Sequence, residues 1–135
     1  MQQEQHVEAI WTGTPWLGRV LSGIAIAFLV VDTAGKLLRV TPVIEGTVRL
    51  GYPESAVFQI GLLLLAGVVL YAIPRTSILG AIYLTGFLGG ALASHFRIGS
   101  PLFSHVLFAV YVAAFVWGGL ALRNPRLLSL LIDAR

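Results

Sequence analysis

The sequence contains no cysteine and few charged side chains. The absence of cysteine excludes disulfide bonds, dithiol redox chemistry, thiolate metal sites and cysteine nucleophiles. Aspartate, glutamate, lysine and arginine make up only 11% of the 135 residues, whereas soluble domains carry about 25%. The net charge of +3 is spread along the chain, which favours lipid head groups over nucleic acid as a charged partner. We therefore expect an integral protein of the lipid bilayer.

The common catalytic and cofactor motifs are also missing from the sequence. It contains no phosphate-binding loop, nucleophile elbow, zinc motif or paired-carboxylate site. No metal site is predicted, and no cofactor is firmly implied. Any redox work would need a partner protein, and the sequence leaves open whether the protein is an enzyme.

Hydrophobic residues make up 57% of the chain and gather in four segments of about 20 residues each. Each segment is long enough to cross a bilayer as a helix. We predict one all-α domain over residues 1–135, an up-and-down bundle of four transmembrane helices. The predicted spans are residues 16–39, 54–73, 77–96 and 102–122. Residues 40–53 form the longest connection, where Pro42, Gly46, Gly51 and Pro53 are expected to break regular structure.

The two ends of the chain are predicted to lie on the same side of the membrane. Val7, Ile10 and Trp11 occur at helical spacing in a polar arm and predict a short interfacial helix. Residues 127–135 predict an amphipathic tail on the surface. Five arginines lie on the side of the termini against four basic residues on the other side, which favours cytoplasmic termini.

The alternation of the spans brings many polar side chains to the opposite face of the membrane. Asp32 and Lys36 are four residues apart, so they share a helix face and can pair. Asp32 is too short to reach the interface, and an ionisable group at that depth must be paired or face a polar cavity. The residues expected to gather there are Asp32, Lys36, Arg39, Glu45, Arg49, His95, Arg97 and His105.

Two interpretations of this polar face stay open. In the first, it is a pocket for a small amphiphile such as a quinone, with Asp32, His95 and His105 as hydrogen-bonding or proton-transferring groups. The ligand-binding candidates beside them are Lys36, Arg39, Arg97 and Tyr111. In the second, these charges only anchor helix ends and hold the long connection. A haem held by the two histidines is a weaker alternative, since their place near the membrane surface does not favour it.

A stripe of small residues follows one face of the third segment. Gly86, Gly90 and Ser94 recur every four residues, a spacing that lets another helix approach closely. This face is the predicted helix-packing surface, for a membrane-protein partner or for a second copy of the chain.

Several stretches resemble the DoxX-like family of small four-span bacterial membrane proteins. The resemblance covers roughly residues 20 to 128 and depends on Leu50–Pro53, Tyr71–Thr76, Leu79–Phe108, Trp117–Gly119 and Leu122–Arg126. His95, Arg97 and His105, with Pro101 between them, match the family's polar pattern, whereas Leu64 stands where many members carry a glutamate. The resemblance implies a four-helix bundle in the bacterial inner (cytoplasmic) membrane.

The resemblance to this family is compatible with several different functions. Some members are linked to thiosulfate:quinone oxidoreduction, others to oxidative-stress complexes, and distant eukaryotic relatives resemble assembly chaperones or cargo receptors. Three functions therefore remain open. They are a redox-associated subunit that binds a quinone, a non-catalytic assembly module, and a small enzyme on a lipophilic substrate with Asp32 and a histidine as acid and base.

Overall fold

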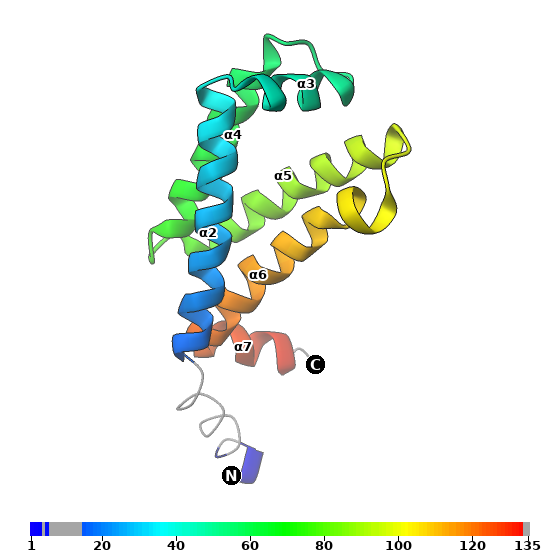
Figure 1. Cartoon of the computed structure of the whole chain (residues 1–135). Helices are drawn as coiled ribbons and strands as arrows, with labels where there is room; N and C mark the ends of the chain where they lie inside the picture. Colours follow the sequence, from blue (N-terminus) through cyan, green and yellow to red (C-terminus); the bar gives the residue numbers. More distant parts are fainter. Residues whose placement is uncertain (4, 6–14, 134–135) are drawn as a thin grey trace.

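The computed structural model describes residues 1–3, 5 and 15–133, and every regular element among them is helical. The predicted interfacial helix around Val7, Ile10 and Trp11 lies outside the described residues. The elements, coloured in chain order in Figure 1, are α2 (Pro15–Leu37), α3 (Thr41–Arg49), α4 (Ala56–Ala72), α5 (Ser77–Arg97), the π-helical turn η1 (Leu102–Val106), α6 (Phe108–Arg123) and α7 (Pro125–Ile132).

Three helical segments are long and apolar enough to cross a membrane. They are α2, α5 and the continuous segment Leu102–Arg123, which joins η1 to α6. The fourth predicted span forms α4, an apolar helix of 17 residues. Pro53 and Pro74 flank α4, and proline disfavours helix in the residue before it, so α4 ends within this interval. The chain is thus an all-helical, multi-pass membrane protein, with three candidate spans and a shorter apolar helix.

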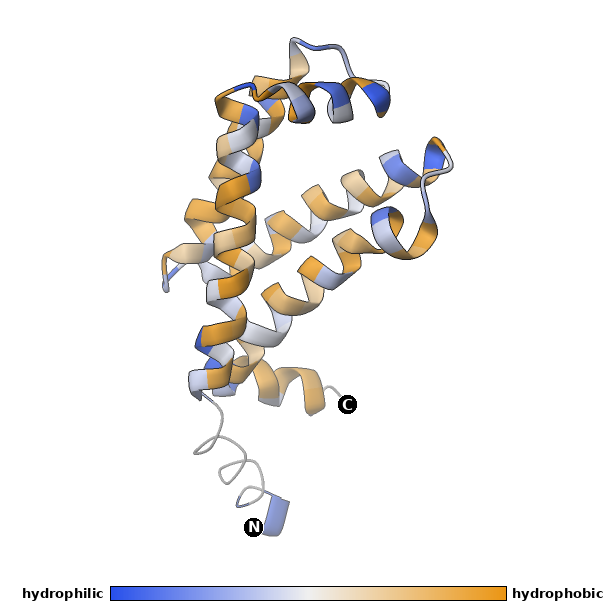
Figure 2. Ribbon diagram, in the orientation of Figure 1, coloured by the Kyte–Doolittle hydropathy of each residue, from blue (hydrophilic) through white to orange (hydrophobic). Residues whose placement is uncertain are grey.

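The four long helices pack around a common core. α2 lies against α4 and α6, α4 lies against α5, and α5 lies against α6. In Figure 1 the α5 and α6 helices run obliquely to α2, and α3 lies across the end of α2. Fully buried side chains such as Leu29, Leu64, Tyr71 and Leu84 fill the centre. Figure 2 shows apolar residues along the long helices and polar residues concentrated at their ends, notably on α3 and after α5.

Glycines bring the helices into close contact at the end where the chain begins and α6 finishes, which we call the closed end. A Cβ atom added to Gly80 would lie 2.3 Å from the backbone nitrogen of Tyr71. One added to Gly119 would lie 2.7 Å from the backbone nitrogen of Ser22. Only glycine permits these backbone approaches, of α5 to α4 and of α6 to α2.

The connection over residues 40–53 differs from the prediction. It contains a regular helix, α3, although Pro42 and Gly46 were expected to break regular structure. Pro42 lies in the first turn, where its missing N–H has no helical partner to lose. Gly46 faces open space, so its only effect on α3 is the low helix propensity of glycine, which lowers the stability of the helix without breaking it.

Three helices end in the same hydrogen-bonded motif at the opposite end of the bundle, which we call the open end. The amide of Val40 donates to Gly35, that of Tyr52 to Thr47 and that of Ser100 to His95. Each pair closes a Schellman motif whose penultimate residue has positive φ. These residues are Arg39 (φ 53°), Gly51 (φ 93°) and Gly99 (φ 70°). The helix ends at this face are therefore well defined.

Candidate functional site

A cavity of about 590 Å³ opens between the helices at the open end. Residues of α2, α3, α4, α5, η1 and α6 line it, so every long helix contributes to its wall. The volume lies within the range of roughly 300–1,000 Å³ that is typical of small-molecule sites. This cavity is the candidate functional site.

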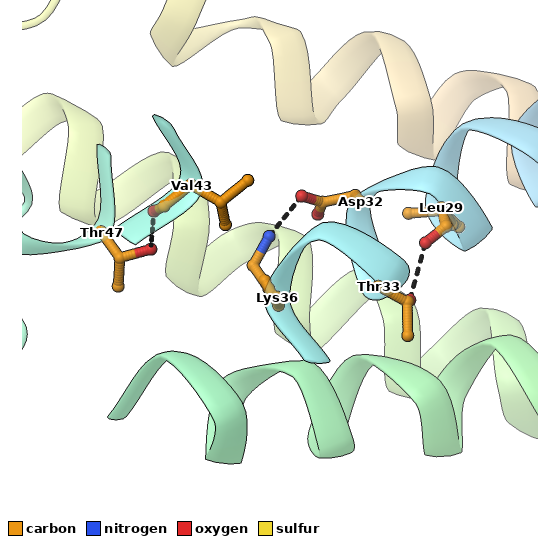
Figure 3. Close-up of polar contacts among 6 residues, drawn as sticks. All are labelled: Leu29, Asp32, Thr33, Lys36, Val43 and Thr47. Atoms are coloured by element: carbon orange, nitrogen blue, oxygen red, sulfur yellow. Dashed lines mark hydrogen bonds and ion pairs between the residues drawn. The ribbon is translucent and has the colours of Figure 1, made fainter. Parts of the chain in front are cut away.

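Asp32 and Lys36 form the charged part of the cavity wall. They are one helical turn apart on α2, and the Lys36 ammonium donates a hydrogen bond to the Asp32 carboxylate. Figure 3 shows the pair beside Val43 of α3, which also lines the cavity. The two side chains are only 14% (Lys36) and 33% (Asp32) exposed. Mutual pairing offsets part of the cost of holding these charges away from water.

Two histidines meet at the other polar part of the wall. The rings of His95, on α5, and His105, on η1, lie 5.8 Å apart between centroids. Nδ1 of His95 lies 3.1 Å from the Ser100 hydroxyl, and Nδ1 of His105 lies 2.7 Å from the Ser104 hydroxyl. The serines orient both rings, and each Nε2 is the nitrogen left for a further partner.

The π-helical turn is part of what brings His105 to the cavity. The carbonyl of Pro101 accepts from the amides of both His105 and Val106, so the chain is wider here than in an α-helix. Such turns change the direction of the side chains that follow and are frequent at functional sites. The sequence carried no signal for this turn.

A third polar group closes the cavity near α3. The Tyr52 hydroxyl lies 2.9 Å from the Ser94 hydroxyl, which donates back to the Gly90 carbonyl. Tyr52 follows α3 and Ser94 lies on α5, so this contact joins the long connection to the bundle. Tyr52 and Thr47 of the lining were not predicted, because contacts made through a connection leave no periodic pattern.

The remaining wall is largely apolar, and two of its glycines lie on α5. Phe28 and Phe108 pack edge to face, with ring centroids 5.1 Å apart. Atoms added to Gly86 or Gly90 would meet nothing within 4 Å, so both glycines leave space along α5. The other large apolar side chains of the wall are Leu29, Val43, Leu50, Ile60, Leu63, Phe87, Leu88 and Val112.

The structure brings together some of the predicted site residues and separates others. Asp32, Lys36, His95, His105, Gly86, Gly90 and Ser94 all line the cavity. Arg39, Arg97 and Tyr111 lie outside its lining and bind other groups. Arg39 pairs with Glu54 at 2.8 Å, Arg97 donates to the carbonyl of Leu50, and the Tyr111 hydroxyl donates to the carbonyl of Phe103.

The cavity wall combines polar and apolar side chains. Within residues 1–3, 5 and 15–133, no three histidine, aspartate or glutamate side chains lie close enough together to hold a metal. The wall provides hydrogen-bonding groups in three places, the Asp32–Lys36 pair, the His95–His105 pair and the Tyr52–Ser94 contact, with aromatic and aliphatic side chains along the rest.

Comparison with known proteins agrees with the membrane architecture. No curated protein and no solved structure matches the chain significantly. The DoxX-like family matches residues 20–119, which include α3, α4 and α5 and most of α2 and α6. This match confirms the resemblance inferred from the sequence segments. The chain belongs to the DoxX-like family.

Proposed function

We propose that the protein is a redox-associated membrane subunit that binds a quinone, or an amphiphile of similar chemistry, in the cavity at the open end. The observation that carries this proposal is the cavity of about 590 Å³, whose largely apolar wall includes two polar parts, Asp32 with Lys36 and His95 with His105. Quinones combine an apolar ring and tail with carbonyl oxygens that accept hydrogen bonds. The proposal also draws on the resemblance to family members linked to quinone chemistry.

The polar groups divide into donors and proton carriers. Lys36 offers N–H donors that remain after its bond to Asp32. Histidine is the side chain best suited to exchanging protons near neutral pH. The contact between His95 and His105 therefore provides a relay, because His105 is exposed whereas His95 is half-buried. Asp32 holds the Lys36 side chain in place through their hydrogen bond.

We further propose that α4 acts as a fourth span, in the bacterial inner membrane and with cytoplasmic termini. Its 17 residues give about 26 Å of helix, close to the roughly 30 Å of a bilayer core. α4 carries no charged residue. An even number of spans puts both termini on one side, and the arginine bias favours the cytoplasm.

A second candidate function is the assembly of membrane complexes. Gly86, Gly89 and Gly90 have nothing within 4 Å of an added Cβ, so this face of α5 is open to a helix of another chain. Such an occupant would fill the cavity with side chains in place of a small molecule.

Substitutions at two neighbouring glycines, Gly89 and Gly90, test the proposed amphiphile site. Gly90→Leu puts a large side chain on the cavity wall, whereas Gly89→Leu adds the same side chain on the same helix outside the lining. Mass spectrometry and ultraviolet–visible spectra of protein purified in mild detergent would report a bound amphiphile. We expect a stoichiometric quinone-like molecule in the wild type and in Gly89→Leu, and its loss from Gly90→Leu.

Two further variants test the polar end. Asp32→Asn and His105→Ala should lose the amphiphile while the helix content and the elution volume stay unchanged. A wild-type protein that carries only bulk lipid would contradict the quinone proposal. Loss of a co-purifying protein or of a dimer from Gly90→Leu would then support the assembly function.

A further inference from the structure

A second cavity lies at the closed end, on the far side of the bundle from the candidate site. It has a volume of about 180 Å³ and lies between the α4–α5 turn and the junction of α6 with α7. Two arginines, Arg75 and Arg123, line it together with Ser77 and Asn124. The proposed amphiphile site uses none of these residues.

Arg123 is held in place by the core of the bundle. Its Nε donates to the Ser22 hydroxyl at 3.0 Å, and its guanidinium carbon lies 5.6 Å from the centre of the Tyr71 ring. The Tyr71 hydroxyl lies 2.8 Å from that of Ser22 and donates to the carbonyl of Val116 at 2.7 Å. The direction of the guanidinium is therefore set before any ligand binds.

The Nη2 nitrogen of Arg123 is buried and has no hydrogen-bond partner within the described part of the chain. Leaving a charged donor without a partner is costly, so a group that accepts its hydrogen bonds would be strongly favoured. A guanidinium has its donors in a planar fork, which matches the oxygens of a phosphate group.

The surroundings of this cavity are positive. No carboxylate of the described residues lines it, and both ion pairs found among those residues lie at the open end. Arg75 is exposed at the rim. Ser77 and Ile78 belong to the first turn of α5, whereas Leu120 and Arg123 belong to the last turn of α6, so the two helix dipoles offset each other and the positive charge comes from the arginines.

We propose that this cavity binds a phosphate-type oxyanion, with Arg123 and Arg75 as its ligands. The two sources of such a group are the head group of an anionic phospholipid and free inorganic phosphate. The apolar residues Pro74, Ile78 and Leu120 complete the lining, and the helix ends place the cavity at the membrane interface. Basic pockets between transmembrane helices on the cytoplasmic side typically bind anionic lipid head groups.

The test uses the full chain in mild detergent and native mass spectrometry with short-chain phosphatidylglycerol. Phosphatidylcholine with the same acyl chains is the control lipid, and inorganic phosphate is the competitor. The variant is Arg75→Gln, which removes an exposed side chain of the cavity. Its matched control is Arg126→Gln, which removes the same charge from an exposed residue of α7 outside the cavity.

We expect phosphatidylglycerol to bind more tightly than phosphatidylcholine. Arg75→Gln should weaken that binding roughly tenfold, because a hydrogen bond to a charged group is lost. Arg126→Gln should change it by less than about twofold. Arg123→Lys keeps the charge without the fork and should also weaken binding. Retained lipid binding in the presence of excess phosphate identifies the lipid as the source, and displacement by phosphate identifies the free ion.

Two results would overturn the proposal. One is equal binding of both lipids together with no binding of inorganic phosphate. The other is an equal effect of Arg75→Gln and Arg126→Gln, which would indicate general attraction to a basic surface. The test measures lipid and phosphate binding only, so its failure leaves the quinone proposal unaffected.

Discussion

The closed and open ends of the bundle use glycine in opposite ways. At the closed end, Gly80 and Gly119 let helix backbones approach so closely that an added methyl group would clash. At the open end, Gly86 and Gly90 face empty space and line the cavity. The same residue type therefore gives close packing at one end and open space at the other, and the distance to the neighbouring helix decides which.

Polar side chains show the same contrast. At the closed end, the hydroxyls of Ser22 and Tyr71 and the guanidinium of Arg123 bind one another within the core. At the open end, Asp32, Lys36, His95 and His105 all line a cavity. Polar groups at the closed end join helices within the core, whereas these four side chains at the open end lie on the wall of a cavity.

The largest expected effect is that of a single methyl group at the closed end. Gly80→Ala forces a Cβ against the Tyr71 backbone and should lower the free energy of unfolding by about 2–3 kcal/mol. Thermal unfolding in mild detergent measures this loss. Gly86→Ala, on the same helix but facing open space, should be neutral or stabilising, since alanine favours helix by about 1 kcal/mol. Equal losses of unfolding free energy in Gly80→Ala and Gly86→Ala would contradict the view that glycine serves close packing at the closed end only.

The next effect concerns the charged pair at the open end. Asp32→Leu leaves Lys36 without its partner and should cost about 1–2 kcal/mol, less than a fully buried pair because Asp32 is 33% exposed. Adding Lys36→Leu should restore most of the unfolding midpoint but not amphiphile binding. A double variant that regained binding would show that the pair serves stability alone.

Removing one tyrosine hydroxyl at each end should give a smaller difference in the free energy of unfolding. Tyr71→Phe removes a buried hydroxyl that bonds to Ser22 and to the carbonyl of Val116, and should cost about 1–2 kcal/mol. Tyr52→Phe removes a hydroxyl from a partly exposed side chain, whose partner Ser94 keeps its bond to Gly90. It should cost about 0.5 kcal/mol or less. Denaturant titration of both variants measures the two losses in the free energy of unfolding. A larger loss for Tyr52→Phe than for Tyr71→Phe would contradict the contrast between the two ends.

The smallest expected effect is a gain in stability. Arg39 ends α2 with φ 53°, a conformation that costs most side chains about 1–2 kcal/mol. Arg39→Gly removes this strain together with an exposed ion pair to Glu54, which is worth little. The net gain should be about 0.5 kcal/mol. Gly99→Ala, at the equivalent position of α5, should instead lower the unfolding midpoint, and a rise there would contradict the explanation.

Much of the secondary structure was predictable because it follows from local properties. Apolar segments between prolines gave helix boundaries within about two or three residues of α2, α4, α5 and the segment Leu102–Arg123. α3 was missed because Pro42 and Gly46 were interpreted as helix breakers, although proline in a first turn breaks nothing.

Only part of the candidate site could be predicted from the sequence. The spacing of Asp32 and Lys36 predicts their pairing, and the alternation of spans places His95 and His105 at one end. The binding of Arg39 to Glu54 and of Arg97 to Leu50 depends on how α3 folds over the helix ends. Sequence periodicity carries no information on such contacts.

The sequence by itself determined that the chain is a helical membrane protein of the DoxX-like family, because hydropathy and family motifs are local properties of the chain. The tertiary structure alone decided which glycines are tightly packed, where the two cavities described above lie and which arginine has a buried nitrogen without a partner among the described residues. The physical reason is that a cavity is the space between helices. Its position depends on how closely their backbones approach, and side chains distant in the sequence set that distance.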